Sequence, residues 1–370
     1  MDDPMRILIC PMNWGLGHAS RDVLIVHKLL NLGHEVILAG DGASLQLLQT
    51  EFPGLKSIHL PPSVRITYFK HLPAWLKIVM LTPLFLYGIM AEHFRLKKII
   101  RTVTPGLVIS DNRYGLWSSK VKCILITHQC SIRLPGLIAF LEYPAALLLK
   151  LLIEKFDRCW IPDYAGGQNL TGDLSHRFRL PSNAVFIGPL SRFSDPDIQL
   201  AGVAYPKLLS LEELPVAELL ILLSGPEPQR TGLEKIILQQ IRGVPVSTIV
   251  LQGLPGKPEM KEIGPQHTLV SHLPAAALKQ LVQKARYIIC RSGYTSIMDL
   301  AEMQKKAMII PTPGQTEQEY LAGFLTDKGM FLSCEQQKLN LSTAIPMLDK
   351  FQPAFNLPGE DPLSRHLEDL

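Results

Sequence analysis

The sequence holds two candidates for a general base, His18 and Asp111. His18 follows Gly15 and Gly17 in the stretch PMNWGLGHAS, where a pair of glycines lets the backbone approach a ligand closely. Histidine titrates near neutral pH, so its imidazole can accept a proton from a substrate hydroxyl. Asp111 follows an apolar run, and a carboxylate can serve the same role. We expect His18 to be the base and Asp111 its competitor; the alternative for His18 is a histidine that only caps a helix.

Further polar side chains follow apolar runs in the first half of the sequence. Asn112 and Arg113 come directly after Asp111, and His128 and Gln129 end the next apolar run. Apolar packing cannot explain the cluster of Asp111 with its two successors. We interpret it as part of a binding site, with a structural turn capped by the Asp or Asn side chain as the alternative.

The second half carries a pattern suited to a nucleoside diphosphate. An apolar run ends in a turn that consists of Arg291, Ser292 and Gly293. Helical spacing follows, so the turn precedes a helix N-terminus whose free N–H groups attract phosphate. Asp299, on the second turn of that helix, is placed to accept hydrogen bonds from a ribose diol, and Gln318 and Glu319 begin the next predicted helix. The alternative is a similar fold that binds nothing at this loop.

The elements that position these residues are strands and helices in alternation. Apolar strands are predicted at 6–10, 35–39, 106–110 and 123–127, and again at 218–223, 246–252, 287–290 and 307–310. This alternation is typical of open parallel sheets, in which ligands bind at the carboxyl ends of the strands. The first loop lacks the dinucleotide pattern G-x-G-x-x-G, because Ser20 occupies the third position. The fold class is therefore α/β, with no nicotinamide cofactor expected.

The chain of 370 residues is long enough for two domains. The boundary is predicted near 187–192, where Gly188 and Pro189 break the last strand of the first half. We therefore expect an N-terminal domain of residues 1–188 and a C-terminal domain of residues 189–370. The last helix, LSRHLEDL, is expected to return to the first domain.

Composition narrows the class of partner. Lys and Arg total 37 against 33 Asp and Glu, so the charge does not indicate a nucleic-acid partner. Hydrophobic residues make up 47% of the chain, and its mean hydropathy is +0.16, which leaves apolar surface that a membrane could cover. Six cysteines without a CxxC pair indicate a reducing compartment. The acidic start that leads directly into a strand predicts no signal peptide.

Two apolar segments in the first half support a membrane partner. Residues 78–91 carry no charge and are interrupted by Pro83, and 134–152 carry only Glu142 and Lys150. Basic residues flank the first segment: Arg65, Lys70 and Lys77 before it, and Arg95, Lys97, Lys98 and Arg101 after it. The first segment is shorter than a bilayer requires, and Pro83 is expected to break it. It is therefore either core or a face that rests on anionic lipid, and the two segments together favour the second interpretation.

The motifs of the second half resemble a known family. The stretch CRSG, an acidic residue six positions after the Gly, a proline-containing loop and a Gln-bearing helix start resemble the donor half of the family 28 glycosyltransferases. The best-known member adds N-acetylglucosamine to the lipid intermediate of peptidoglycan synthesis. The resemblance implies that Asp299 binds ribose, and that Gln318 and Glu319 face the sugar.

The same resemblance assigns further residues. Gly15, Gly17 and His18 match the family's acceptor-side loop, and His128 with Gln129 matches its acceptor loop, although the family has His-Glu-Gln-Asn there. Asn112 and Arg113 join this acceptor-binding group. The donor-side matches are the diphosphate-binding Arg192, the phosphate loop with Ser224, Gly225 and Arg230, and the base-binding edge at Leu273. Two prolines replace glycine positions of the phosphate loop, which removes backbone donors.

The resemblance implies a GT-B architecture, two Rossmann-like domains that face a cleft, with the acceptor on the N-terminal domain and the donor on the C-terminal one. The implied reaction is inverting transfer of a hexose or N-acetylhexosamine from a UDP-sugar to a lipid-linked or other membrane acceptor, such as a cell-envelope glycolipid. Arg192, helix N-termini and loop amides would stabilise the leaving group, so no cofactor and no metal is expected. The implied location is cytoplasmic, peripheral on the inner face of the membrane.

Two other functions remain open from the sequence. A UDP-sugar 2-epimerase shares the two-domain fold but needs no acceptor, and the apolar segments weigh against it. A noncatalytic lipid- or nucleotide-binding protein on the same scaffold would bind UDP without releasing it from a UDP-sugar.

Overall fold

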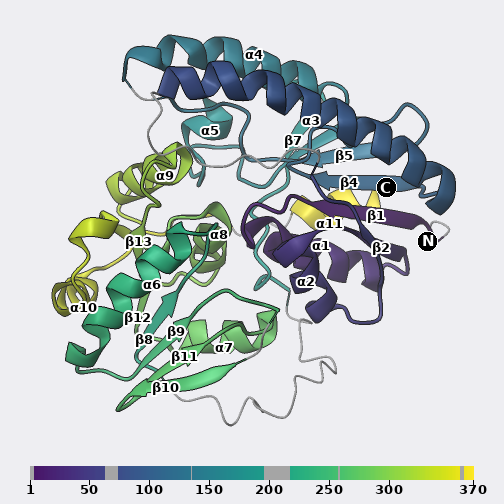
Figure 1. Cartoon of the computed structure of the whole chain (residues 1–370). Coiled ribbons are helices and arrows are strands. Elements are labelled where there is room, and N and C mark those ends of the chain that lie inside the picture. Colours follow the sequence, from purple (N-terminus) through teal and green to yellow (C-terminus); the bar gives the residue numbers. More distant parts are fainter. Residues whose placement is uncertain (1–3, 63–73, 135, 196–216, 257–258, 359–361) are drawn as a thin grey trace.

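A computed structural model of the chain describes residues 4–62, 74–134, 136–195, 217–256, 259–358 and 362–370, with the backbone alone for 74–81 and 137. Two α/β domains lie side by side, the N-terminal domain toward the upper right of Figure 1 and the C-terminal domain toward the lower left. The flanking residues Arg65 and Lys70 lie outside the described residues, as does the side chain of Lys77.

The N-terminal domain is built on a parallel sheet. Within the described residues it has seven strands in the order β3-β2-β1-β4-β5-β6-β7, and every recorded pairing is parallel. The strands are β1 (Arg6–Pro11), β2 (Glu35–Gly40), β3 (Lys56–His59), β4 (Leu107–Asp111), β5 (Lys122–Ile126), β6 (Arg158–Ile161) and β7 (Ala184–Phe186). The inner strands β1 and β4 are nearly continuous buried apolar runs, as expected for a sheet covered on both faces.

Helices cover both faces of this sheet. Ile7 and Ile9 of β1 face the core formed with α1 (Gly17–Asn31) and α2 (Gly42–Glu51). Leu8 and Cys10 face the opposite core, formed with α3 (Ala74–Val103) and α4 (Glu142–Ile153). The alternation follows from the two-residue period of a strand. The short element η1 (Gly136–Leu141) leads directly into α4, and α5 (Asp173–His176), which follows β6 in the sequence, lies below α4 in Figure 1.

The C-terminal domain has a second sheet of the same kind. Its seven described strands follow the order β10-β11-β9-β8-β12-β13-β14. They are β8 (Leu219–Leu222), β9 (Thr248–Leu251), β10 (Met260–Gly264), β11 (His267–Val270), β12 (Tyr287–Arg291), β13 (Met308–Ile310) and β14 (Leu332–Ser333). The pairing of β10 with β11 is antiparallel and the other pairings are parallel, so this edge hairpin was missed by the sequence prediction.

Two helical layers enclose the second sheet. One layer consists of α6 (Gln229–Gln240) and α10 (Leu341–Lys350), with the 3-10 turns η2 (Ile241–Gly243) and η3 (Gln336–Lys338) beside them in the sequence. The other consists of α7 (Ala275–Lys284), α8 (Tyr294–Glu302) and α9 (Thr316–Asp327). Because α8 also contacts α1, one buried apolar cluster runs through both domains.

The strand orders mark the place where a ligand binds. Each sheet reverses its winding at a switch point, between β1 and β4 in the first domain and between β8 and β12 in the second. Open parallel sheets bind ligands in the crevice outside the carboxyl ends of the strands at such a point. The loops after these four strands contain Gly15, Asn112, Ser224 and Gly293, and His18 follows the first of them at the start of α1.

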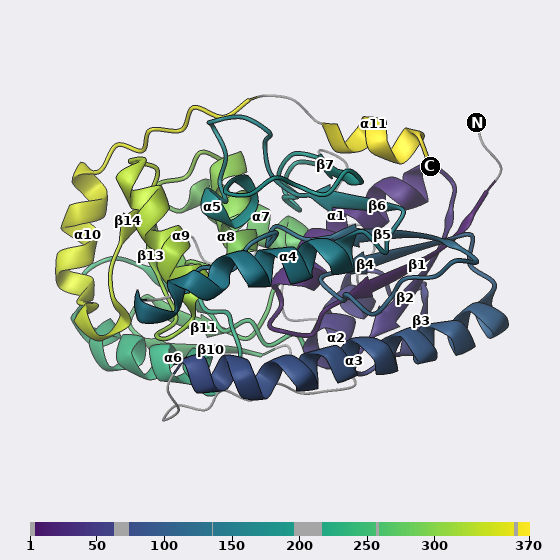
Figure 2. The same cartoon turned by 90° about the horizontal axis from the view of Figure 1, so that it is seen from above.

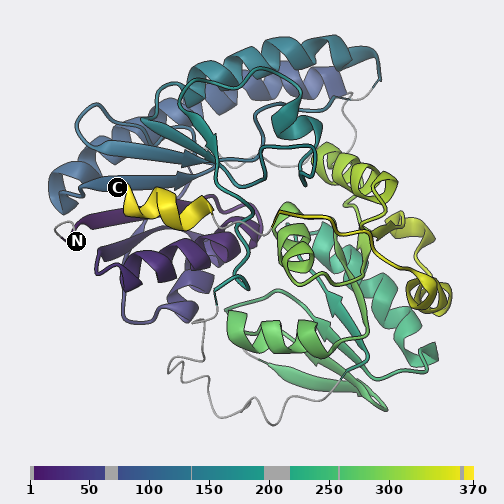
Figure 3. The ribbon, with the colours of Figure 1, turned by 180° about the vertical axis from the view of Figure 1, so that it is seen from behind.

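The C-terminal helix returns to the first domain. After α10 the chain crosses the molecule to α11 (Pro362–Glu368), as Figures 2 and 3 show. Leu363 and Leu367 of α11 are buried in the cluster that includes α1, and Lys28 Nζ donates to Ser364 Oγ at 2.6 Å. The segment thereby ties the two domains together.

One local prediction was wrong. Pro83 lies inside α3, which continues from Ala74 to Val103 without the expected break. Burial of the other side of the helix through Ile89 and Leu96 offsets the hydrogen bond that a proline removes. In the part of the chain that the structure describes, no helix combines the length and apolar character needed to cross a bilayer.

Leu367→Ala should lower the stability of the protein by about 2–5 kcal/mol, because it leaves a cavity where α11 meets the first domain. Glu368→Ala, at the exposed neighbouring position, is the matched control and should change stability by less than about 0.5 kcal/mol. Urea unfolding of both variants measures the difference. Equal stabilities would mean that α11 does not contribute to the core.

Candidate active site

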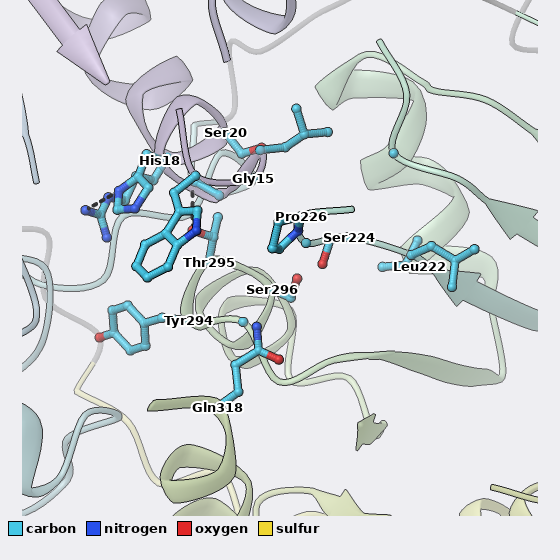
Figure 4. Close-up of a pocket in the computed structure, with 18 of the residues that line it drawn as sticks. Gly15, His18, Ser20, Leu222, Ser224, Pro226, Tyr294, Thr295, Ser296 and Gln318 are labelled. Atoms are coloured by element: carbon cyan, nitrogen blue, oxygen red, sulfur yellow. Dashed lines mark hydrogen bonds between the residues drawn. The ribbon is translucent and has the colours of Figure 1, made fainter. Parts of the chain in front are cut away.

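A cavity of about 140 Å³ lies between the two domains at the switch points of both sheets. The N-terminal domain contributes the loop after β1, the start of α1 and the loops after β4 and β5. The C-terminal domain contributes the loops after β8 and β12 and the start of α9. Figure 4 shows Gly15 and His18 on one side and Ser224, Ser296 and Gln318 on the other.

Two glycines allow the domains to approach each other here. Gly15 has φ +82° and Gly225 has φ +101°, conformations that glycine adopts without strain. A Cβ atom placed on Gly15 would lie 3.6 Å from Gly225 Cα, so the two loops run in close contact. Thr295 Oγ1 donates to the Gly17 carbonyl oxygen at 2.9 Å. The loop predicted to bind the acceptor therefore contacts the donor-side loops directly.

His18 lies near the start of α1, where it makes a hydrogen bond to a buried carboxylate. Its Nδ1 lies 2.8 Å from Asp111 Oδ1, at the end of β4. Arg21, one helical turn after His18, binds both oxygens of Asp111 through Nε and Nη2. Asp111 and Arg21 are fully buried, whereas His18 lines the cavity.

The charge on Asp111 determines which nitrogen of His18 carries the proton. Burial alone would raise the pKa of Asp111, but Arg21 and His18 lower that pKa below its usual range. The ionised carboxylate can only accept, so Nδ1 of His18 must carry the proton in their hydrogen bond. Arg21 Nη2 also lies 3.1 Å from His18 Nδ1, but Nη2 donates its hydrogen bond to Asp111 Oδ1. In the neutral ring, the proton on Nδ1 places the lone pair on Nε2, as a general base requires.

A second histidine connects the two domains across the cavity. His128 Nδ1 lies 3.2 Å from Arg21 Nη1, and its Nε2 lies 2.9 Å from Glu317 Oε1 of α9. Burial lowers the pKa of His128, and Arg21 lowers it further against the opposing effect of Glu317. A neutral ring satisfies both contacts, with Nδ1 as the acceptor and Nε2–H as the donor. Gln129 also donates to Glu317, and the ring of Tyr294 stacks on His128 at 4.3 Å.

The donor side of the cavity combines backbone groups of several loops with the side chains of Arg192 and His272. Ser224 and Gly225 follow β8, and Gly293 precedes α8, whose first residues also line the cavity. Arg192 reaches the cavity from the linker between the domains. His272 is 4% exposed, and its Nε2 has no hydrogen-bond partner among the described residues. Burial, with a smaller effect of Arg192, lowers the pKa of His272 to about 3, so this ring is neutral.

The cavity brings together just over half of the residues predicted from the sequence. Those that line it are Gly15, Gly17, His18, Asn112, His128, Gln129, Arg192, Ser224, Gly225, Gly293 and Gln318. Asp111 lies behind His18 and does not line it. The roles of all these residues toward donor and acceptor stay predictions.

The other predicted donor residues are buried in contacts of their own. Arg230 pairs with Glu227 and Glu234 on its own helix and the turn before it. Arg291 donates to the carbonyl oxygens of Pro311 and Gln229 and to Gln336 Oε1. These bonds hold both arginines away from the cavity wall.

Four more predicted donor residues lie outside the wall. Ser292 donates to the Gln318 carbonyl oxygen, and Glu319 accepts from the backbone of Gly314. Leu273 is buried beside His272. Asp299 accepts from Ser191 Oγ at 2.9 Å and from Arg192 Nε at 3.0 Å, so both its oxygens are bound by the linker in this structure.

Arg113, predicted on the acceptor side, is part of a buried ion pair. Its guanidinium donates to Glu92 Oε1 of α3 at 2.8 Å and 3.1 Å, and to the Leu60 carbonyl oxygen at 3.0 Å. It does not line the cavity. The contact explains why a charged residue follows the buried end of β4.

The cavity is also lined by residues that were not found from the sequence, among them Arg21, His272, Thr295 and Glu317. Arg21 had a recognisable signal, because it lies three residues after His18 and therefore on the same face of the predicted helix. Glu317 precedes the pair chosen at the start of α9, and only the fold shows that it faces His128. Across the described ranges, no three side chains of His, Cys, Asp and Glu gather as ligands for a metal ion.

Comparisons with known proteins indicate the class of enzyme to which the chain belongs. Residues 256–354 match the model of the glycosyltransferase family 28 C-terminal domain. An uncharacterized glycosyltransferase of Methanosarcina acetivorans is 22% identical over 343 residues, which cover 88% of this chain and 84% of the relative.

Solved structures share the fold along the whole chain. The glycosyltransferase SnogD from Streptomyces nogalater has a TM-score of 0.60 at 16% identity, over 99% of this chain and 94% of that one. Acinetobacter baumannii MurG has a TM-score of 0.50 at 12% identity, over 99% and 98% of the two chains. The predicted GT-B architecture is confirmed. The chain is a glycosyltransferase, with a family 28 type domain in its C-terminal half.

Arg113→Ala should lower stability by about 3–5 kcal/mol, because it leaves the buried Glu92 carboxylate without its partner. The double variant Arg113→Leu with Glu92→Leu should recover most of that loss. Thermal or urea unfolding measures stability, and nucleotide binding serves as the second readout. If Arg113→Ala had normal stability but impaired sugar transfer, Arg113 would instead belong to the acceptor site.

Proposed function

We propose that this glycosyltransferase moves a hexose or N-acetylhexosamine from a UDP-sugar to a lipid-linked or other membrane acceptor, with inversion at the anomeric carbon. The observation that carries the proposal is the 2.8 Å hydrogen bond between His18 and the buried Asp111 at the wall of the inter-domain cavity. It orients the imidazole of His18 at the place where an acceptor hydroxyl would be activated.

In the proposed reaction the acceptor oxygen attacks the anomeric carbon while His18 Nε2 accepts the hydroxyl proton. The bond from that carbon to the diphosphate oxygen breaks, and UDP leaves with the electron pair. Asp111 stays ionised and stabilises the imidazolium that forms, as a buried carboxylate does beside a catalytic histidine. Arg21 in turn balances the charge of Asp111.

Donor binding is proposed for the C-terminal side of the cavity. The N-terminus of α8 and the loop at Ser224 and Gly225 present backbone N–H groups at a sheet switch point, where phosphate binds favourably. Arg192 supplies positive charge for the leaving diphosphate. The neutral His272, with its free Nε2, suits a hydrogen bond to the nucleobase. We propose that no metal is needed for this step.

A membrane acceptor is supported by the surface of the N-terminal domain. Three large aromatic side chains of this surface are more than 60% exposed: Tyr87 and Phe94 of α3, and Tyr143 of α4. Exposed apolar side chains in such number mark an interaction surface. Lys97, Lys98 and Arg101 follow on α3 and suit anionic lipid. We propose a peripheral position on the cytoplasmic face of the membrane, as the family resemblance implies.

UDP, and not NAD, should raise the melting temperature of the protein. His272→Ala should weaken UDP binding by about 1–3 kcal/mol, the cost of a lost hydrogen bond in a buried site. His267→Ala removes a buried histidine outside the cavity and should leave UDP affinity unchanged. Calorimetry with UDP measures both; equal affinities in the two variants would remove His272 from the donor site.

His18→Ala should lower turnover by roughly 10²–10⁴-fold with UDP affinity unchanged, because only the proton acceptor is lost. Asp111→Asn should lower turnover less. The assay follows UDP release from UDP-N-acetylglucosamine or UDP-glucose in the presence of a membrane lipid extract. Near-normal turnover in His18→Ala, or a defect confined to UDP affinity, would contradict the assignment of His18.

A further inference from the structure

A second cavity lies in the N-terminal domain, away from His18. It has a volume of about 270 Å³ and lies between α4, α5 and the segment 177–181. Cys130 and Ser131 form part of its wall, and they directly follow His128 and Gln129, which line the inter-domain cavity. We name it the α4 cavity. One loop thus borders both the α4 cavity and the acceptor side of the cleft.

The α4 cavity is basic. Lys150, Arg177 and Arg179 line it, and no carboxylate does so among the described residues. Arg177 pairs with Glu142, and Lys150 lies 3.8 Å from Glu154. Arg179 has no ion pair in the described part of the chain. The uncompensated positive charge suits an anionic ligand.

Large side chains at the rim of the α4 cavity face solvent. Tyr143 and Leu147 line the cavity, yet they are 66% and 49% exposed. Phe140 and Leu151, one turn to either side, are 73% and 55% exposed. Tyr143, Leu147 and Leu151 share one face of α4 because they are spaced by four positions, and Phe140 precedes them near the end of η1. We call these four residues the α4 stripe.

The α4 stripe belongs to a broader surface of the same character. Figures 1 and 3 show α3 and α4 on the same outer side of the N-terminal sheet. Helix α3 exposes Tyr87, Met90 and Phe94 there, with basic residues toward its end. Apolar and aromatic residues beside cations are the composition of surfaces that rest on anionic bilayers.

We propose that the α4 cavity binds the headgroup of an anionic phospholipid, while the α4 stripe enters the adjoining interface of the bilayer. A free phosphate ion would need the cations but not the exposed apolar rim, so the rim favours a lipid. The inference rests on the proposed membrane position and deepens it, because a lipid held here orients the loop at 128–131, and with it the acceptor side of the cleft, toward the membrane.

The test compares two double variants of the full chain. Lys150→Gln with Arg179→Gln removes two charges from the α4 cavity, and Lys120→Gln with Arg158→Gln removes two from exposed positions of the same domain outside it. Sedimentation measures binding to vesicles of phosphatidylcholine alone, and of phosphatidylcholine and phosphatidylglycerol in equal parts. Each basic residue near an anionic surface contributes roughly a fivefold effect, so the cavity variant should bind the anionic vesicles ~25-fold more weakly. The control variant should stay close to the wild type.

Two further arms identify the ligand. Short-chain phosphatidylglycerol below its micelle concentration should raise the melting temperature of the wild type but not of the cavity variant, and inorganic phosphate should raise neither. Stabilisation by inorganic phosphate to the same extent would overturn the lipid assignment. UDP affinity should be normal in both variants, which shows that they are folded.

The outcomes separate this inference from the proposed function. If the wild type prefers anionic vesicles and the cavity variant binds them equally well, the α4 cavity is not the site. If the wild type binds neither kind of vesicle, the membrane acceptor fails and the inference fails with it. If the wild-type protein did not bind UDP, the proposed donor would be contradicted instead.

Discussion

Arg21 and Asp111 form a buried ion pair where the first helix meets the carboxyl end of β4. Both side chains are removed from water, which is costly, and their mutual hydrogen bonds offset that cost. The pair orients His18 through its Nδ1 and reaches His128 through Arg21. The adjacent Asp22 is also fully buried, and burial together with Asp111 raises its pKa well above the usual value. Burial and the neighbouring charge of Asp111 both favour the neutral form of Asp22, so Asp111 is the carboxyl of the two that favours the charged form and binds His18.

The rest of the cleft depends on contacts that hold the second domain against this pair. Glu317 binds His128 and Gln129, and Thr295 binds the backbone at Gly17. The linker contributes a further link, because Ser191 and Arg192 both bind Asp299 of α8. Each contact joins the second domain either to the first domain or to the linker between them. The position of the base relative to the donor loops is thus a property of both domains together.

Much of this arrangement was predictable from the sequence, for physical reasons. Continuous apolar runs identified the inner strands of both parallel sheets, and glycines marked the loop before His18. The hydrogen bond between His18 and Asp111 was not predicted as a pair, because it requires β1 and β4 to be neighbours although 93 positions separate the two residues. The resemblance to family 28 placed Asp299 and Arg192 at the donor site but could not show that they bind each other. The arginines Arg113, Arg230 and Arg291 look like ligand-binding residues in sequence, and only the fold shows the partners that bury them.

The most direct test of the account is the anomeric configuration of the transferred sugar. A base at His18 that activates the acceptor for direct attack inverts the anomeric centre, so a UDP-α-sugar should give a β-linked product. The coupling constant of the anomeric proton in the NMR spectrum of the product distinguishes the two configurations. A β-linked product is the predicted result, and an α-linked product, with retained configuration, would contradict the single displacement that His18 and Asp111 are proposed to support.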